Sequence, residues 1–166
     1  YAGNSTGKTI GGFVMSKWSD IKMYDLSIPI GINTPPWPTY EPLQMKFFKR
    51  LAPNGANGQL LTHSNHVGTH LDGPLHFDTA GRDMASLELT KLCAPGVVVD
   101  LSDQAEDWGI YTPEDIEKRV EVKEGDILII NTGYHIYGWD SPTADERRYM
   151  LRHPGPSLDF IQWVRD

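Results

Sequence analysis

The sequence contains a single cysteine, Cys93, so no disulfide can form within the chain. This scarcity fits a reducing compartment and predicts a cytoplasmic location. No apolar run approaches the length of about 18 residues that spans a bilayer. No basic patch followed by an apolar stretch is found near the first residue either. We therefore expect neither a membrane protein nor a secreted one.

Positive charge is also in short supply. Fifteen Lys and Arg stand against 22 Asp and Glu, which gives a net charge of −7. That field repels a long polyanion, so nucleic acid is a poor partner, and a small-molecule substrate is expected instead. The 166 residues, 39% hydrophobic and 22% charged, have the ordinary composition of one globular domain with its own core.

The chain divides into two parts by composition. Residues 1–20 are rich in Gly, Ser, Thr and Lys and show no lasting period, which predicts a flexible leader. Residues 21–166 read as one folded domain. Within it, residues 23–30 read as a strand, and residues 31–42 must form an extended loop because they carry four prolines. A second short strand is predicted over residues 59–63.

The middle of the chain predicts a layer of strands and helices. Residues 96–101 and 126–131 are short β-branched runs, typical of strands buried on both faces. Between them, Thr112-Pro113-Glu114-Asp115 predicts a helix start, with the helix running to about Val120. Strand, helix and strand in this order favour a βα layer, with parallel pairing as one option. Ser141-Pro142 and Ser157 predict two more helix starts.

The last segment carries apolar residues at helical spacing but no terminating Gly, Asn or Pro before Asp166. A native end that frays and a polypeptide that continues both fit this pattern.

The densest polar cluster holds four of the six histidines between His63 and His76. His66, His70 and Asp72 are candidate ligands, because imidazole nitrogen and carboxylate oxygen suit Zn²⁺ or Mn²⁺. On a helix Asp72 would lie about 200° round from His70, and on a flat strand His66 and Asp72 would be about 20 Å apart. The segment must therefore bend, and Gly68, Gly73 and Pro74 make a bend cheap.

Three protein ligands leave an open position for water, which is the pattern of a catalytic metal. A bound divalent ion lowers the pKa of its water toward about 7. His76 lies four residues past Asp72 and is the candidate to carry protons between that water and a leaving group. His63 is a weaker candidate, and its alternative role is only to cap the strand predicted over residues 59–63. The alternative is a fortuitous cluster of satisfied polar histidines.

Residues 66–77 read His-Val-Gly-Thr-His-Leu-Asp-Gly-Pro-Leu-His-Phe and match the signature H-x-G-T-H-x-D-x-P-x-H-F. The sequence thereby resembles the metal-dependent cyclase-like hydrolases, the family of kynurenine formamidase and isatin hydrolase. Asp25-Leu26-Ser27, Trp37-Pro38 and Asn131-Thr132-Gly133 agree with it. The resemblance covers the chain from about Tyr24 onward.

The resemblance implies an α/β protein of the swivelling β/β/α fold, with a small barrel-like β core and outer helices. It implies that His66, His70 and Asp72 bind one or two divalent ions, Mn²⁺ or Zn²⁺, and that His76 is the catalytic acid–base residue. It also implies a homodimer or homotetramer in which the N-terminal region helps complete a neighbour's site. The reaction implied is hydrolysis of an amide, imide or lactone-type bond, often in a cyclic substrate.

The sequence departs from the family in its C-terminal part. Members with two metals take a further His and Glu from there, and nothing in this sequence matches that segment. His135 and His153 are possible substitutes, but His153-Pro154-Gly155 reads better as a turn before a helix. We therefore expect the C-terminal part of the fold to be missing, or to be supplied by a separate segment.

Two other functions stay open at this point. One is a binding or structural module that keeps the fold without catalysis, and the other is a metal-dependent cyclase or lyase. Trp37 and Phe77 are the aromatic residues predicted to line a substrate pocket, with Trp108 and Trp139 as weaker candidates. The same aromatic residues could instead belong to the core.

Overall fold

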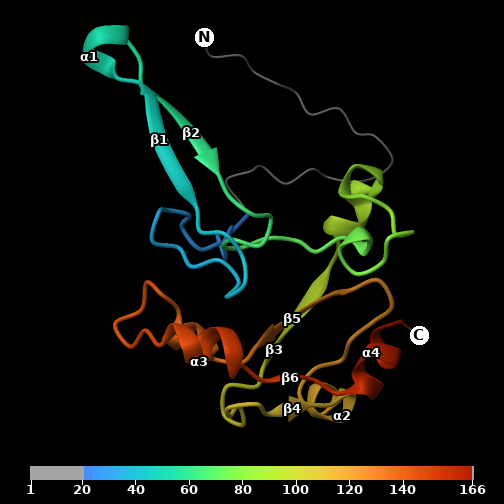
Figure 1. The fold of residues 1–166 in the computed structure, drawn as a ribbon. Helices are drawn as coiled ribbons and strands as arrows, with labels where there is room; N and C mark the ends of the chain where they lie inside the picture. The colour runs from blue at the N-terminus through green and yellow to red at the C-terminus, as the bar shows by residue number, and fades with distance from the viewer. Residues whose placement is uncertain (1–20, 166) are drawn as a thin grey trace.

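The computed structural model describes residues 21–165 as a mixed α/β chain with three two-stranded sheets (Figure 1). The strands are β1 (Gln44–Lys49), β2 (Gly58–Thr62), β3 (Gly96–Asp100), β4 (Ile110–Tyr111), β5 (Ile127–Asn131) and β6 (Gly155–Pro156). The α-helices are α1 (Leu51–Asn54), α2 (Pro113–Glu117), α3 (Glu146–Leu151) and α4 (Leu158–Arg165). The predicted leader, residues 1–20, lies outside the described residues.

The core lies beside the β3–β5 sheet. The two strands pair in parallel, with Val99 opposite Ile130, so the predicted strands and their parallel pairing are confirmed. Val99 is fully buried and belongs to one hydrophobic cluster with Leu101, Ile116 of α2 and Phe160 of α4. Parallel strands need a crossover connection, and α2 lies in it.

The opposite face of this sheet is not covered by the described residues. Val98 is 61% exposed and its cross-strand neighbour Ile129 is 39% exposed. The prediction that both faces are buried is therefore wrong for residues 21–165. An uninterrupted β-branched run marks a strand but does not reveal how many layers cover it.

The predicted start of α2 is confirmed by a capping box. The Thr112 hydroxyl accepts from the backbone N–H of Asp115, and the Asp115 carboxylate accepts from the backbone N–H of Thr112 at 2.8 Å. Pro113 occupies the first turn, where its missing N–H costs nothing. The helix ends at Glu117, three residues earlier than predicted, because the chain tightens into a turn in which both Arg119 and Val120 donate to Ile116 O.

The two later helix starts had different outcomes. Ser157 precedes α4, and its Oγ accepts from the Phe160 N–H at 3.2 Å, as a cap should. The prediction at Ser141-Pro142 is wrong, because those residues form a turn and α3 begins only after Asp145, which caps the Arg148 N–H. The turn predicted over residues 153–155 is not found, because residues 153–154 have no regular structure and Gly155 with Pro156 forms the short strand β6 before α4.

Residues 23–42 belong to no sheet. The proline-rich loop, residues 31–42, is a loop as expected but not an extended one, because it contains two turns, in which the Thr34 N–H donates to Gly31 O and the Tyr40 N–H donates to Trp37 O. Residues 23–30 form no strand, which corrects the prediction made there. They are held instead by side chains, as where the Ile28 N–H donates to Thr69 Oγ1 at 3.0 Å. An isolated bridge between Pro36 and Val67 brings the proline-rich loop alongside the histidine motif.

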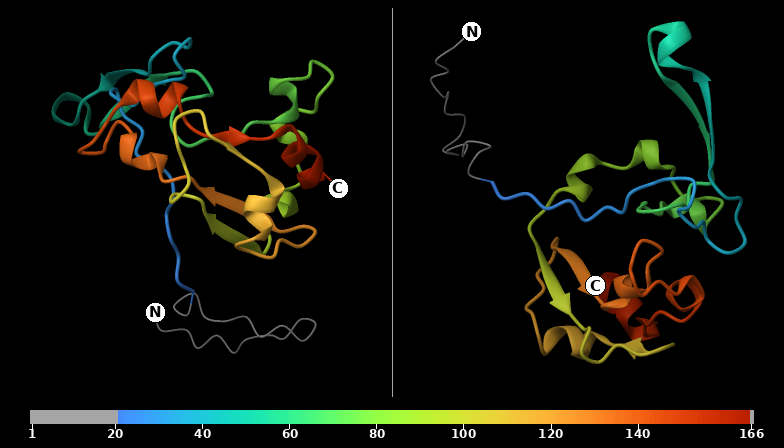
Figure 2. Two further views of the ribbon diagram at one scale, coloured as in Figure 1. Left: turned by 90° about the horizontal axis from the view of Figure 1, so that it is seen from below. Right: turned by 90° about the vertical axis from the view of Figure 1, so that its left-hand side faces the viewer.

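An antiparallel hairpin, β1 and β2, projects away from the rest of the described chain (Figure 1; Figure 2, right). The second strand was predicted, whereas β1 was not. All six residues of β1 are exposed, and a register irregularity lies between Phe47 and Lys49. We define residues 44–62 as the hairpin arm.

The described residues form no closed barrel, so the predicted barrel-like core is not seen in residues 21–165. The swivelling arrangement and the missing C-terminal part stay predictions. Within the described chain, no helix is long and apolar enough to span a membrane.

Candidate metal centre

The histidine motif, residues 63–76, begins directly after β2. It bends at Gly68, one of the residues at which the sequence predicts a bend. Gly68 has a φ of +67°, a left-handed conformation that costs glycine little and other residues more. A Cβ there would also approach Ile30 Cγ1 to 3.0 Å. At the far end, Gly73 and Pro74 open a short 3₁₀ turn, Pro74–His76, which the His76 N–H closes on Gly73 O at 2.9 Å. The predicted bend in a loop leaving a strand is confirmed.

This bend brings the three predicted ligands together. His66 Nδ1 lies 3.1 Å from His70 Nε2 and 3.1 Å from Asp72 Oδ1. His70 Nε2 lies 3.5 Å from the same Asp72 oxygen. In a tetrahedral site with bonds of about 2.0–2.1 Å, two ligand atoms lie about 3.3 Å apart. The three donor atoms therefore have the spacing of one face of such a tetrahedron.

The orientation of His70 favours this use. Its Nδ1 lies 2.8 Å from Gly68 O, so a proton on Nδ1 is donated to that carbonyl. Nε2 then presents a lone pair to His66 Nδ1 and Asp72 Oδ1. Lone pairs that converge in this way repel one another unless a cation or a proton lies between them. A backbone carbonyl that fixes the second ring nitrogen is a common support for metal-binding histidines.

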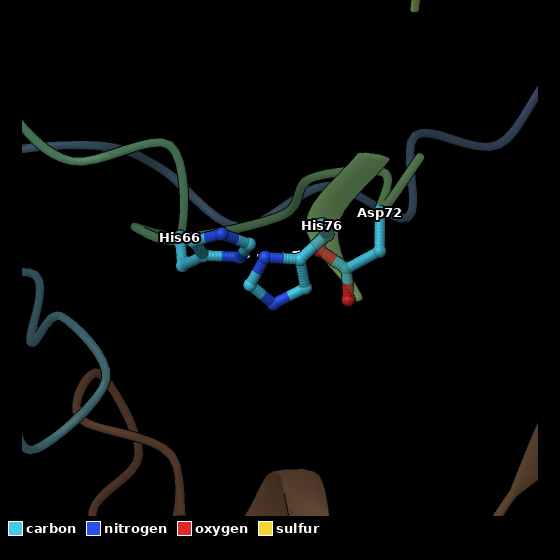
Figure 3. Close-up of side chains that lie close together, drawn as sticks. All are labelled: His66, Asp72 and His76. Carbon is cyan, nitrogen blue, oxygen red and sulfur yellow. Dashed lines mark ion pairs between the residues drawn. The ribbon is translucent and has the colours of Figure 1, made fainter. Parts of the chain in front are cut away.

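His76 joins the same cluster from the 3₁₀ turn (Figure 3). Ligand atoms of His66, Asp72 and His76 all lie within 4.8 Å of one another, and the imidazole rings of His66 and His76 are 4.1 Å apart. His66 and Asp72 thus belong to two overlapping triads, completed by His70 or by His76. The geometry suits His76 as a ligand or as a neighbouring acid–base group, so the division of roles stays a prediction.

The cluster forms part of the wall of a cavity of about 530 Å³. Both predicted pocket residues line it, Trp37 being 41% exposed and Phe77 85% exposed. The other residues that line it are Ile28, Pro35, Tyr40, His66, Gly68, His70, Asp72, His76, Trp139, Tyr149 and Met150. Of the two weaker aromatic candidates, Trp139 lines this cavity and Trp108 does not. Tyr149 and Met150 were missed, because nothing in the local sequence of α3 shows that it faces the motif.

The remaining histidines lie elsewhere. His63 lines a different cavity at the base of the hairpin arm, and its Nδ1 lies 2.7 Å from Ser64 O. His135 and His153 line a neighbouring cavity of about 440 Å³, which shares Trp37, Tyr149 and Met150 with the first. Neither belongs to the group of three residues among residues 21–165, His66, Asp72 and His76, whose spacing could hold a metal ion.

Comparison with known proteins identifies a family that this chain matches. Residues 24–166 match the profile of the Cyclase family, described as "Putative cyclase". Kynurenine formamidase of Geobacillus thermodenitrificans is 34% identical over 92 residues, which are 54% of this chain and 41% of that protein. The Bacillus anthracis kynurenine formamidase is 33% identical over 89 residues, 53% of this chain and 40% of that protein. The matched segments therefore span about two fifths of these relatives.

Solved structures agree on the fold. Isatin hydrolase A from Ralstonia solanacearum superposes with a TM-score of 0.73 at 19% identity, over 88% of this chain and 63% of the other. A second structure, described as a novel cyclase, gives a TM-score of 0.64 at 17% identity, over 85% of this chain and 62% of the other. The described residues thus form an α/β fold similar to that of isatin hydrolase.

Proposed function

The chain belongs to the Cyclase family, and we propose that it acts as a metal-dependent hydrolase of amide bonds in small, aromatic or cyclic substrates. The names of its relatives, kynurenine formamidase and isatin hydrolase, support this reaction class. The chain covers less than two thirds of each, so the activity and the substrate are both proposals.

One observation carries the proposal: His66, His70 and Asp72 have donor atoms 3.1–3.5 Å apart at the edge of a cavity. These three residues would hold the cation, with Zn²⁺ and Mn²⁺ as the candidates from the donor set. When bound there, a divalent cation supplies a water of lowered pKa and polarises a carbonyl oxygen. Three protein ligands would leave a coordination position open for that chemistry.

The chain's own residues have separate tasks in this proposal. Asp72 supplies the negative charge of the cluster, and Gly68 O fixes the ring of His70. His76 takes a proton from the attacking water and returns one to the leaving nitrogen. The water oxygen bonds to the carbonyl carbon while the C–N bond breaks, so one water is consumed for each acid and amine formed.

The cavity wall favours a flat apolar ring. Trp37, Phe77 and Trp139 bring aromatic surfaces to the same cavity as the cluster, and Tyr149 and Met150 extend that surface from α3. Aromatic and apolar walls with a few polar groups at one end are typical of small-molecule sites. We infer that the scissile amide faces the cluster and that the ring lies along the aromatic wall.

The direct test combines metal analysis with turnover. We expect about one or two Mn²⁺ or Zn²⁺ ions per chain. We also expect hydrolysis of formanilide, an aromatic formamide, or of isatin, with loss of activity on chelation and recovery on adding the metal back. A chain that binds metal without turning over either compound fits a binding module. A product formed by elimination or ring closure without uptake of water identifies a lyase or cyclase instead.

A homodimer or homotetramer remains part of the proposal, and the hairpin arm supports it. An isolated two-stranded hairpin is marginal in water. Phe48 and Leu60 of the arm are 63% and 49% exposed, and the arm carries three basic residues and no acidic one in a chain of net charge −7. We expect light scattering to give a multiple of 18.6 kDa. Phe48→Ser with Leu60→Ser should lower that mass, and a wild-type monomer would count against assembly.

A further inference from the structure

A carboxylate outside the metal cluster organises the loop before β4. Asp107 Oδ1 accepts from the Tyr134 hydroxyl at 2.7 Å and from Arg148 Nε at 2.6 Å. Asp107 Oδ2 lies 3.5 Å from Arg152 Nη1. Hydrogen bonds from Tyr134 and Arg148 hold the pKa of Asp107 below its usual value, so the group stays ionised at neutral pH. The proposed hydrolysis does not use this group.

The next residue, Trp108, makes two hydrogen bonds to the C-terminal end of α3, the helix that contains Arg148. Its backbone N–H donates to Arg152 O at 2.8 Å, and its indole Nε1 donates to Leu151 O at 3.0 Å. One residue thereby satisfies two carbonyls at the C-terminal end of α3, where partners within the helix run out. Trp108 adopts a φ of +58°, a left-handed conformation that a side chain other than glycine rarely takes. The contacts to α3 stabilise this strained backbone.

These contacts hold one face of α3 while the other face lines the cavity. Arg148 lies within α3 and Arg152 directly follows its last residue, and both side chains contact Asp107. The Arg148 guanidinium also stacks 4.1 Å from the centre of the Tyr137 ring. Tyr149 and Met150, about 100° and 200° further round, line both the cavity at the metal cluster and its neighbour. A shift of α3 would therefore move the cavity wall opposite the histidines.

We propose that Asp107 is a positioning residue that fixes α3, and with it Tyr149 and Met150, so that the cavity fits the ring of an aromatic amide. It touches neither the cluster nor the cavity and acts through α3. This inference rests on the proposed function, because it takes the cavity to be the substrate site. It predicts an effect on substrate binding rather than on metal binding or bond cleavage.

The test compares Asp107→Ala and Asp107→Asn with a matched control. Asp103→Ala also removes a carboxylate paired with an arginine, Arg119 at 2.8 Å, but that pair lies outside the contacts of α3. With formanilide or isatin as substrate, we expect Asp107→Ala to raise KM five- to thirtyfold while kcat changes less than threefold. Asp107→Asn keeps a hydrogen-bond acceptor and should fall between Asp107→Ala and the wild type. Asp103→Ala should match the wild type.

A second measurement reports on the helix without turnover. Amide hydrogen exchange over residues 146–152 should be faster in Asp107→Ala and unchanged in Asp103→Ala, while metal content stays at the wild-type level. An unchanged KM in Asp107→Ala, or a fall in kcat alone, overturns the positioning role while leaving hydrolysis intact. A wild-type chain that hydrolyses no amide instead refutes the proposed function, and the positioning role falls with it.

Discussion

Replacing His70 by alanine tests whether the predicted ligands bind the metal and the other histidines do not. The ligand atoms of His66, His70 and Asp72 lie at similar distances from one another, 3.1–3.5 Å. We therefore assign each ligand an equal share of the free energy of metal binding. A four-ligand zinc site is worth about 10–16 kcal/mol, or roughly 2.5–4 kcal/mol for each ligand. At about 1.4 kcal/mol for each factor of ten, His70→Ala should weaken Zn²⁺ binding by roughly 10²–10³-fold.

The assay is competition between the apoprotein and a chromogenic zinc chelator at fixed pH. His63→Ala is the matched control, because His63 belongs to the same histidine-rich segment but lines a different cavity. We expect its zinc affinity to stay within twofold of the wild type. If His70→Ala also stays within twofold, or if His63→Ala is equally damaging, the bend does not define the metal site. Turnover of His70→Ala should be lost along with the metal.

Three further outcomes are expected. His76→Ala should keep its metal by elemental analysis but lose about 10²–10⁴-fold in kcat if His76 transfers protons, whereas loss of the metal would make it a ligand. Ile116→Ala should lower the free energy of unfolding in urea by about 2–5 kcal/mol, because Ile116 is fully buried, whereas Ile110→Ala, at a side chain 71% exposed, should change it by less than about 0.5 kcal/mol. The pKa of Asp107 lies below the unfolded value of 3.8, mainly because the Tyr134 hydroxyl donates a hydrogen bond to it. The pKa of Asp115 also lies below that value, mainly because the Thr112 backbone N–H donates to its carboxylate. These carboxylates therefore stabilise the fold above about pH 4, and this contribution is lost as the pH falls through their folded pKa. Urea midpoints that stayed constant down to pH 2 would contradict this.

The local parts of the fold were predictable because their causes are local. The cap at Thr112, the proline that follows it and the acids of the first turn lie next to one another, and the helix starts there. The ligand bend was equally predictable, because neither a helix nor a flat strand could bring His66 and Asp72 together. Gly68 supplies the left-handed residue that the bend needs.

Features that depend on distant contacts were not predictable from the residues alone. Alternation over residues 23–30 indicated a strand, but a strand also needs a partner, and a side chain, Thr69, takes that backbone hydrogen bond. Tyr149 and Met150 line the cavity from α3, a helix whose contacts to Asp107 and Trp108 come from about forty residues earlier in the chain. Whether Val98 and Ile129 are exposed depends on which layers cover the sheet, and a β-branched run does not indicate how many layers there are.

All four side chains of the proposed cation site come from eleven consecutive residues, 66–76, whereas α3 lies about seventy residues further along the chain. Closing the longer loop costs about 1.7 kcal/mol more in chain entropy than closing the shorter one. A denatured polypeptide could therefore still chelate zinc while having no pocket at all. Added metal should raise the melting temperature less than its affinity for the native protein implies, because both states compete for it.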